Sequence, residues 1–575
     1  MINRLSKSIR QYRKVSLLAP FFVTLEVIME VLVPTIMAYL IDNGINKGDM
    51  NAIGRIGFIL IIACILSLIF GVLSGKYAAE ASTGFAANLR KDMFYRVQDF
   101  SFANIDKFSS SSIVTRLTTD ITNLQNAYQM IVRVAVRCPV MLVFALIMAF
   151  NVNHKLALVF LSAIPILGVG IFFIMKNAHP VFEKVFKMYD SLNLVVQENL
   201  RGMRVVKSFV REDFEEKKFK NVSKDIYDNS TKAEKLLMFN MPLMQFAMYG
   251  CILLISWFGA KLILTDSMTT GELMSMFSYA TQILMSLMMF SMVFVMVTMS
   301  RASAERISEI LDEESTLKNN SHPVFDVRDG SVDFENVFFS YSDTDSAPVL
   351  NNISLSIKSG DTIGIIGGTG SSKSSLVQLI PRLFDVTGGT VRVGGVDVRD
   401  YDIETLRDAV SMVLQKNELF SGTIKDNIRW GDENASDKDI ERVCKLAQAH
   451  EFIKDFPDGY DTYIEQGGSN VSGGQKQRLC IARALLKKPK ILILDDSTSA
   501  VDTKTDSLIR RAFAEEIPDT TKIIIAQRIS SVQDSDKIII LENGHIDSMG
   551  THSELMETSD IYRELYYSQM KGGEE

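Results

Sequence analysis

The sequence has few cysteines and no excess of positive charge. Its five cysteines show neither pairing nor metal-ligand spacing: Cys64, Cys138, Cys251, Cys444 and Cys480. We therefore expect them to be small, buried apolar side chains in a reducing compartment. The net charge of −7 gives no support for a nucleic-acid partner. A cleavable signal is also lacking, because the apolar run that follows the basic first 14 residues is longer than a signal peptide allows.

Hydrophobic residues are abundant for a chain with this much charge. They make up 47% of the 575 residues, while 22% are charged. The length predicts several domain-sized units. This mixture predicts a membrane-embedded half joined to a water-soluble half.

Six long apolar segments supply the predicted membrane half, residues 1–313. Each is long enough to cross a hydrocarbon core of about 30 Å as a helix. The predicted spans are 17–41, 56–78, 128–150, 155–175, 237–263 and 272–298. Residues 1–15 precede them and carry Arg4, Lys7, Arg10, Arg13 and Lys14 among apolar residues. We interpret them as a helix lying on the membrane surface, the alternative being a solvated charged helix.

The gaps between the spans differ in charge. Residues 79–127 and 176–236 are long, rich in lysine and arginine and almost free of proline. The positive-inside rule places both of them, and both chain ends, in the cytoplasm. Their helical pattern predicts that the spans continue beyond the bilayer. Each gap has one break, at 100–112 and 209–214, where we expect contact with a cytoplasmic domain.

Two features inside the spans have a functional and a structural interpretation. Glu26 and Glu30 lie four residues apart in the first span, on one face of a helix. They form either a polar patch in a substrate path, or a hydrogen bond within the bundle or an end tilted into water. The last two spans are rich in methionine, which suits either a surface for varied apolar ligands or ordinary packing. The methionines are Met238, Met241, Met244, Met248, Met274, Met276, Met285, Met288, Met289, Met292, Met296 and Met299.

The pattern changes after the last span. Residues 314–329 lack periodicity and are interpreted as a linker. From Gly330 to the end, short β-rich runs alternate with helical stretches, which is typical of a three-layer α/β domain. The expected strands are 332–339, 353–357, 362–366, 390–393, 409–413, 491–494 and 522–526.

A glycine-rich turn follows the expected strand 362–366. Its glycines allow a tight turn, and its backbone N–H groups, with a helix predicted at 376–383, form a cradle for phosphate groups. Lys373 can reach a β- or γ-phosphate, and the Ser374 hydroxyl can bind Mg²⁺. The residue before this lysine is Ser372, where the usual motif has glycine. The expected nucleotide-binding residues are Gly367, Gly368, Thr369, Gly370, Ser371, Ser372, Lys373, Ser374 and Ser375.

Two further motifs belong with this cradle. The buried strand at 491–494 ends in Asp495, placed to hold Mg²⁺, and Asp496, at the position of the base that polarises the attacking water. The run Ser472, Gly473, Gly474 and Gln475 precedes a helix predicted at 477–486, whose N-terminus can bind a phosphate. One domain does not need two phosphate cradles for one ATP, so two domains are expected to face each other.

Six spans followed by these three motifs resemble a type IV ABC exporter half-transporter over essentially the whole chain. The resemblance implies a fold class: an α-helical polytopic membrane domain with long cytoplasmic extensions, followed by an α/β P-loop ABC ATPase domain at 330–575. It further implies ATP and Mg²⁺ as ligands, and the breaks at 100–112 and 209–214 as coupling helices. Other positions carried over by match are Tyr341 (adenine stacking), Gln415 (Q-loop and Mg²⁺), Gln466 (before the signature) and Asp502 (D-loop).

The chain departs from the family pattern at two catalytic positions. Asp496 stands where the family has glutamate, and Gln527 stands where it has the switch histidine. Aspartate is one methylene shorter, and an amide cannot carry the charge of an imidazolium. With Ser372, three positions of the chain's own site are altered, while the signature Ser472–Gln475 is intact.

These departures predict one half of a heterodimer. Its own site would bind ATP but hydrolyse it slowly, and its signature would complete the competent site of the other half-transporter. The expected function is multidrug-type export of hydrophobic or amphipathic compounds across the bacterial-type plasma membrane, in contact with lipid. The alternatives are neutral drift in a homodimeric exporter or lipid flippase, a non-transporting ATP-gated membrane sensor, and a soluble-type ATPase with a membrane anchor.

Overall fold

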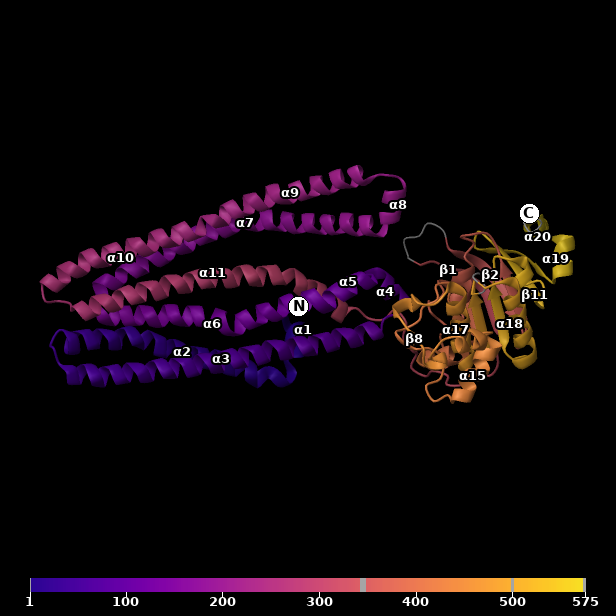
Figure 1. Cartoon of the computed structure of the whole chain (residues 1–575), viewed down its shortest axis with the longest axis horizontal. Helices are drawn as coiled ribbons and strands as arrows, with labels where there is room; N and C mark the ends of the chain where they lie inside the picture. Colours follow the sequence, from indigo (N-terminus) through magenta and orange to yellow (C-terminus); the bar gives the residue numbers. More distant parts are fainter. Residues whose placement is uncertain (1, 342–347, 498–500, 572–575) are drawn as a thin grey trace. The chain divides into compact units, whose positions relative to one another are not determined.

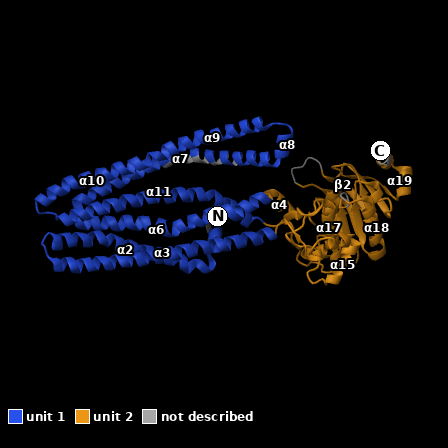
Figure 2. Ribbon diagram, viewed as in Figure 1, with its two compact units in different colours: residues 1–98, 110–313 blue, residues 99–109, 314–575 orange. Residues whose placement is uncertain are grey.

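The computed structural model divides the chain into two compact units, which are described separately (Figure 2). The first comprises residues 1–98 and 110–313, and the second comprises residues 99–109 and 314–575. Within them the structure describes residues 2–341, 348–497 and 501–571. The sequence-based division placed residues 99–109 with the membrane half; by their contacts they belong with the second unit.

The described residues of the first unit form helices joined by short turns, with no strand among them, and six of the helical segments are long and apolar enough to cross a membrane. The prediction of six long apolar helices is therefore confirmed. Figure 1 shows these helices running alongside one another. Its elements are α1 (Ile2–Ser6), η1 (Lys7–Tyr12), α2 (Arg13–Leu40), η2 (Ile41–Ile45), α3 (Met50–Gln98), α5 (Ser110–Thr115), η3 (Arg116–Asp120), α6 (Ile121–Val152), α7 (His154–Arg201), α8 (Met203–Ser208), α9 (Glu212–Met238), α10 (Asn240–Leu264) and α11 (Thr270–Asp312).

Helical structure is the expected outcome for these apolar runs, because lipid leaves backbone N–H and C=O groups no partner except one another. Helix α2 packs against α3 and α6, and α6 packs against α11. A buried core forms among α2, α6, α7, α10 and α11, with Tyr279, Met276 and Phe160 almost fully enclosed. Cys64 corrects one expectation, because its side chain is exposed on α3 whereas the other four cysteines are buried.

Two short elements of this unit differ from the sequence-based prediction. The expected surface helix 1–15 is instead a short helix and a 3₁₀ turn, because Arg10 adopts a non-helical conformation before α2 begins. The expected break at 209–214 begins earlier: Gly202 ends α7, and the short helix α8 occupies Met203–Ser208. Residues 209–211 then form a turn before α9.

The second unit is an α/β domain built on three sheets. The main sheet has six strands in the order β12-β11-β3-β10-β9-β6, all parallel except β12. An antiparallel sheet has the order β2-β1-β4-β5, and β7 pairs with β8. The strands are β1 (Val332–Phe339), β2 (Leu350–Ile357), β3 (Thr362–Ile366), β4 (Gly388–Val393), β5 (Val396–Asp397), β6 (Val410–Val413), β7 (Gly422–Thr423), β8 (Tyr463–Ile464), β9 (Ile491–Asp495), β10 (Thr521–Ile525), β11 (Lys537–Glu542) and β12 (His545–Gly550).

Helices and 3₁₀ turns surround these strands. They are α4 (Phe102–Phe108), α12 (Lys373–Gln378), α13 (Ile403–Ala409), α14 (Ile424–Arg429), α15 (Asp437–Leu446), α16 (His450–Lys454), η4 (Gly459–Asp461), η5 (Gln466–Gly468), α17 (Gly473–Leu486), α18 (Thr503–Glu516), η6 (Ile529–Ser531), α19 (His552–Thr558) and α20 (Asp560–Lys571). The helix predicted at 376–383 is therefore displaced toward the chain start, and the helix predicted at 477–486 begins four residues earlier.

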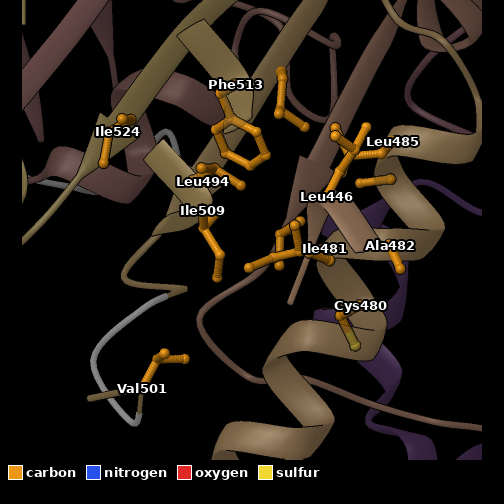
Figure 3. Close-up of a cluster of buried hydrophobic side chains, with 14 of the residues drawn as sticks. Leu446, Cys480, Ile481, Ala482, Leu485, Leu494, Val501, Ile509, Phe513 and Ile524 are labelled. Atoms are coloured by element: carbon orange, nitrogen blue, oxygen red, sulfur yellow. The ribbon is translucent and has the colours of Figure 1, made fainter. Parts of the chain in front are cut away.

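The main sheet is buried on both faces, which is why its strands read as continuous apolar runs. Alternate side chains point to opposite faces. Ile491 and Ile493 contact the antiparallel sheet, whereas Leu492 and Leu494 contact the helical side. Figure 3 shows the helical side, where Leu494 and Ile524 of the sheet lie near Ile481 and Leu485 of α17 and Ile509 and Phe513 of α18.

Candidate nucleotide-binding site

The predicted phosphate cradle lies at the carboxyl end of β3, in the middle of the main sheet. Residues 367–372 connect β3 to α12, and Lys373 is the first residue of that helix. The neighbouring strand β9 ends at Asp495, at the same edge of the sheet. Parallel strands thus bring the glycine-rich turn and the carboxylates together, although more than 100 residues separate them in sequence.

A cavity of about 520 Å³ occupies this edge. It contains nearly all of the predicted phosphate, Mg²⁺ and catalytic positions, together with four residues that were not predicted as site residues, Val349, Ile366, Ile525 and Leu565. The predicted residues that line it are Gly367, Gly368, Thr369, Gly370, Ser371, Ser372, Lys373, Ser374, Ser375, Gln415, Asp495, Asp496 and Gln527. No sequence motif marks Leu565, which α20 supplies from the far end of the chain.

Lys373 is held over the turn by the turn's own atoms. Its Nζ donates to the carbonyl oxygens of Gly367, at 2.9 Å, and Gly368, at 2.8 Å, and lies 3.2 Å from Ser371 Oγ. Burial lowers the pKa of this lysine, while Asp495 and Asp496 oppose the shift. The ammonium is therefore placed at the mouth of the cradle, where a phosphate oxygen can replace the two carbonyl groups.

The carboxylates beside the cradle are bound by the side chains of other predicted site residues. Asp495 is buried and forms a hydrogen bond with Ser374. Burial raises the pKa values of Asp495 and Asp496. A hydroxyl, a carboxylate and the Gln415 amide are oxygen donors of the kind that Mg²⁺ prefers. Ser374 and Asp495 already touch each other, so this donor set fits the metal that the sequence predicts.

Asp496 is restrained by two amides. Gln527 Nε2 donates to Asp496 Oδ2 at 2.9 Å, and Gln415 also forms a hydrogen bond with this carboxylate. Its backbone has a φ of +48°, a conformation that aspartate tolerates better than most residues. The residue at the expected base position is therefore fixed in place by the residue at the expected switch position.

The remaining predicted residues do not line the cavity. Tyr341 lies beside it, with its hydroxyl 2.9 Å from Ser375 Oγ and its ring packed edge-on against Phe384. Asp502 caps the N-terminus of α18 by accepting a hydrogen bond from Thr505 N, and Gln466 begins η5. Two residues that precede Asp502 in its motif, 499 and 500, lie outside the described residues.

The signature forms the N-terminus of α17. Ser472 Oγ accepts from Gln475 N at 3.3 Å, and Gln475 Oε1 accepts from Ser472 N at 2.9 Å. This reciprocal capping fixes the first helical turn. Ser472 and Gln475 thus hold the glycine residues between them at a helix end that carries a partial positive charge.

The two carboxylates of the first span are also partnered. Arg137 of α6 forms ion pairs with both Glu26 and Glu30 of α2. Sequence reasoning considered the glutamates but missed this arginine, since nothing in a local pattern shows which spans lie next to each other. An interaction within the bundle is therefore present, as the structural interpretation expected.

Ser372→Gly is expected to stabilise the second unit by about 0.5–1 kcal/mol. Ser372 has a φ of +71°, a left-handed conformation that costs a non-glycine residue about 1–2 kcal/mol. Glycine removes this strain, but its greater flexibility in the unfolded chain offsets about 0.4–1 kcal/mol of the gain. Thermal unfolding of the purified protein without nucleotide measures the change. Ser371→Gly, at a neighbouring position without positive φ, is the control and should lower the melting temperature. If the Ser372→Gly variant melted at or below the temperature of the unmodified protein, the inferred backbone strain at Ser372 would be contradicted.

Comparisons with known proteins match a family model to each of the two units. Residues 16–314 match the ABC transporter transmembrane region, and residues 350–499 match the ABC transporter family model. The chain is 39% identical over 561 residues to the uncharacterized ABC transporter ATP-binding protein YfiB of Bacillus subtilis, covering 98% of this chain and 97% of the relative.

Two further comparisons also cover nearly the whole chain. A Staphylococcus aureus protein named, provisionally, a multidrug export ATP-binding/permease protein is 30% identical, with 93% of this chain and 94% of the relative covered. The structure of a bacterial Atm1-family ABC exporter with ATP bound superimposes with a TM-score of 0.83 at 23% identity, covering 97% of this chain and 98% of that one. The chain therefore belongs to the ABC transporter family, as a half-transporter with one transmembrane unit followed by one ATP-binding unit.

Proposed function

We propose that this chain is the degenerate-site half of a heterodimeric ABC exporter. One observation carries the proposal: the carboxylate at the base position, Asp496, accepts a hydrogen bond from Gln527 at 2.9 Å. A general base must reach the attacking water, and an error of about 1 Å in position can cost about 100-fold in rate. A short carboxylate already bound by an amide is poorly suited to that role.

Nucleotide binding is a separate matter from hydrolysis. The cradle, Lys373 and the Ser374–Asp495 pair are all in place for ATP and Mg²⁺. The intact signature residues at the start of α17 do not line the chain's own cavity. In the proposed dimer it completes the site on the other half-transporter, where the hydrolysis that resets the exporter takes place.

Transport follows from closure of the two ATP-binding units. Helix α4 lies in the second unit, where Phe102 contacts Phe384 and Ser101 Oγ lies 2.7 Å from Thr316 Oγ1. We propose that α4 and the region around α8 are the coupling helices that pass this closure to the spans. The chain ends and the ATP-binding units lie in the cytoplasm in this proposal, and both half-transporters open outward together.

The proposed cargo is a hydrophobic or amphipathic compound taken from the cytoplasm or the inner leaflet. The named role of the Staphylococcus aureus relative supports this, as do the exposed methionines of α10 and α11, such as Met241, Met285 and Met292. Flexible thioethers can pack against ligands of different shapes.

The proposal is tested by purifying the tagged chain from its native membrane. A second half-transporter with glutamate and histidine at the positions of Asp496 and Gln527 should copurify. The chain alone should hydrolyse ATP at least about 10-fold more slowly than the pair. Brisk turnover by copies of this chain alone would favour a homodimeric exporter or flippase. A pair that binds ATP but neither moves nor responds to any amphiphile would favour a membrane sensor.

A further inference from the structure

A charged triad lies at the centre of the transmembrane unit and has no role in nucleotide binding. Arg137 Nη1 donates to Glu26 Oε1, and Arg137 Nη2 donates to Glu30 Oε2 at 2.5 Å. We call Glu26, Glu30 and Arg137 the triad. Each lies within three positions of the midpoint of its predicted span, residue 29 or residue 139. Three residues of helix correspond to about 4.5 Å, so the triad is close to the middle of the bilayer.

The triad is not electrically balanced, because two carboxylates share one guanidinium. Two other ion pairs of this unit, Asp120–Arg306 and Arg116–Glu309, lie beyond the spans. A surplus negative charge at mid-membrane is costly, and such residues normally mark a ligand or ion path. A purely structural ion pair would need only one of the two glutamates.

One oxygen of the triad has no hydrogen-bond donor. Glu26 is only 9% exposed, and its Oε2 accepts no hydrogen bond from any described residue. Gln282 of α11 lies beside the triad, since its Nε2 donates to Glu30 O at 3.3 Å, and its buried Oε1 also lacks a donor. Leaving such acceptors without a partner in an apolar environment is unfavourable. The site therefore has fewer hydrogen-bond donors and less positive charge than its acceptors and carboxylates require.

Helix α3 leaves room for this arrangement. A Cβ atom at Gly71 would lie 3.2 Å from Glu26 Oε1, so a larger residue would displace the carboxylate. Access comes from Glu30, whose side chain is 37% exposed. Another cation of α6 is Arg133, one turn before Arg137; its guanidinium lies beside Gly75 and forms no ion pair among the described residues. About 6 Å of helix separates the two arginines, so Arg133 does not supply the missing donor at Glu26.

We propose that the triad binds a cationic group of the cargo that carries N–H donors, such as a protonated amine, an amidinium or an amino-substituted aromatic cation. The ligand's N–H groups would donate to Glu26 Oε2 and Glu30, and its charge would balance the second carboxylate. This inference rests on the proposed export of amphipathic compounds and narrows that class to cations with N–H donors.

The test compares a cationic and a neutral fluorescent probe on the exporter purified with its copurifying partner and placed in lipid nanodiscs. Ethidium carries a fixed positive charge and amino groups, whereas N-phenyl-1-naphthylamine is neutral and apolar. Glu26→Gln preserves shape and leaves Arg137 paired with Glu30, so no buried charge is left alone. We expect it to weaken ethidium binding by about 10-fold or more, since charged hydrogen bonds are lost. Binding of the neutral probe should change by less than about twofold.

Two further variants guard against misinterpretation. Glu30→Gln removes the more exposed carboxylate and should weaken ethidium binding in the same way, so the test holds even where Glu26→Gln fails to fold. Glu80→Gln removes an equal charge from the exposed side of α3 and should leave both probes unaffected. If the triad variants weakened the binding of both probes equally, or if ethidium binding were unchanged in both variants, the inference would be overturned. The proposed export of amphiphiles would not be affected by either result. An exporter that binds neither probe in its unmodified form would overturn both.

Discussion

Gly473→Asp in this chain is expected to lower the ATP turnover of the pair by about 100-fold or more, the cost typical of removing a donor for a developing anion. Gly473 is the first residue of α17, between the capping residues Ser472 and Gln475. In the proposed dimer this helix end faces the γ-phosphate at the partner's competent site. An aspartate there adds a negative charge where phosphate must bind.

The companion variant, Lys373→Ala, removes the ammonium from this chain's own cradle. Because that site is proposed to hydrolyse slowly, the turnover of the pair should fall by less than about threefold, while nucleotide binding to this chain weakens. Steady-state phosphate release by the pair and photolabelling of this chain with an ATP analogue measure the two effects. If Lys373→Ala proved the more damaging to turnover, the assignment of competent and degenerate sites would be reversed.

The sequence predicted the ATP-binding fold well where local signals coincide with burial. Strands β1 and β3 have the predicted bounds, Val332–Phe339 and Thr362–Ile366, because β1 is rich in valine and phenylalanine, β3 is a short apolar run, and polar residues or glycine limit both. The phosphate cradle and the strand carboxylates also meet as expected, since parallel strands end at one edge of the sheet.

Helix boundaries were predicted less well, and the reasons are specific. Helix α12 was expected to run to residue 383, but it ends at Gln378 because Pro381 lies just beyond and Arg382 has a φ of +50°. The second cytoplasmic break was placed at residues 209–214, whereas Gly202 ends α7 earlier. In both cases a helix breaker in the sequence was given too little weight.

Apart from the meeting of the parallel strand ends, contacts between distant segments could not be predicted. Arg137 pairs with two glutamates more than 100 positions away in sequence, and the hydrogen bond between Gln527 and Asp496 spans 31 positions. Periodicity identifies the face of a helix that is buried, but it does not say which neighbour covers that face. The lining of the cavity by Leu565 was missed for the same reason.

Asp496→Glu combined with Gln527→His is expected to raise hydrolysis at this chain's own site by about 10- to 100-fold. The longer side chain of glutamate recovers the reach that aspartate lacks. The second change removes the amide that now donates to Asp496 Oδ2, leaving the carboxylate available to water. Asp496→Glu alone should gain less than about threefold, because Gln527 can still bind the new carboxylate.

The measurement needs a background in which the partner's site is silent, and Gly473→Asp in this chain provides it. In that background, residual ATP turnover by the pair arises from this chain's cradle, capped by the partner's signature. Gln527→His alone is the matched control and should stay within about threefold of the background, because Asp496 remains too short. A double variant no faster than this control would mean that the base and switch positions do not limit the site. The strained Ser372 in the cradle would then be the remaining difference to test, since its φ of +71° affects how the turn presents its N–H groups to phosphate.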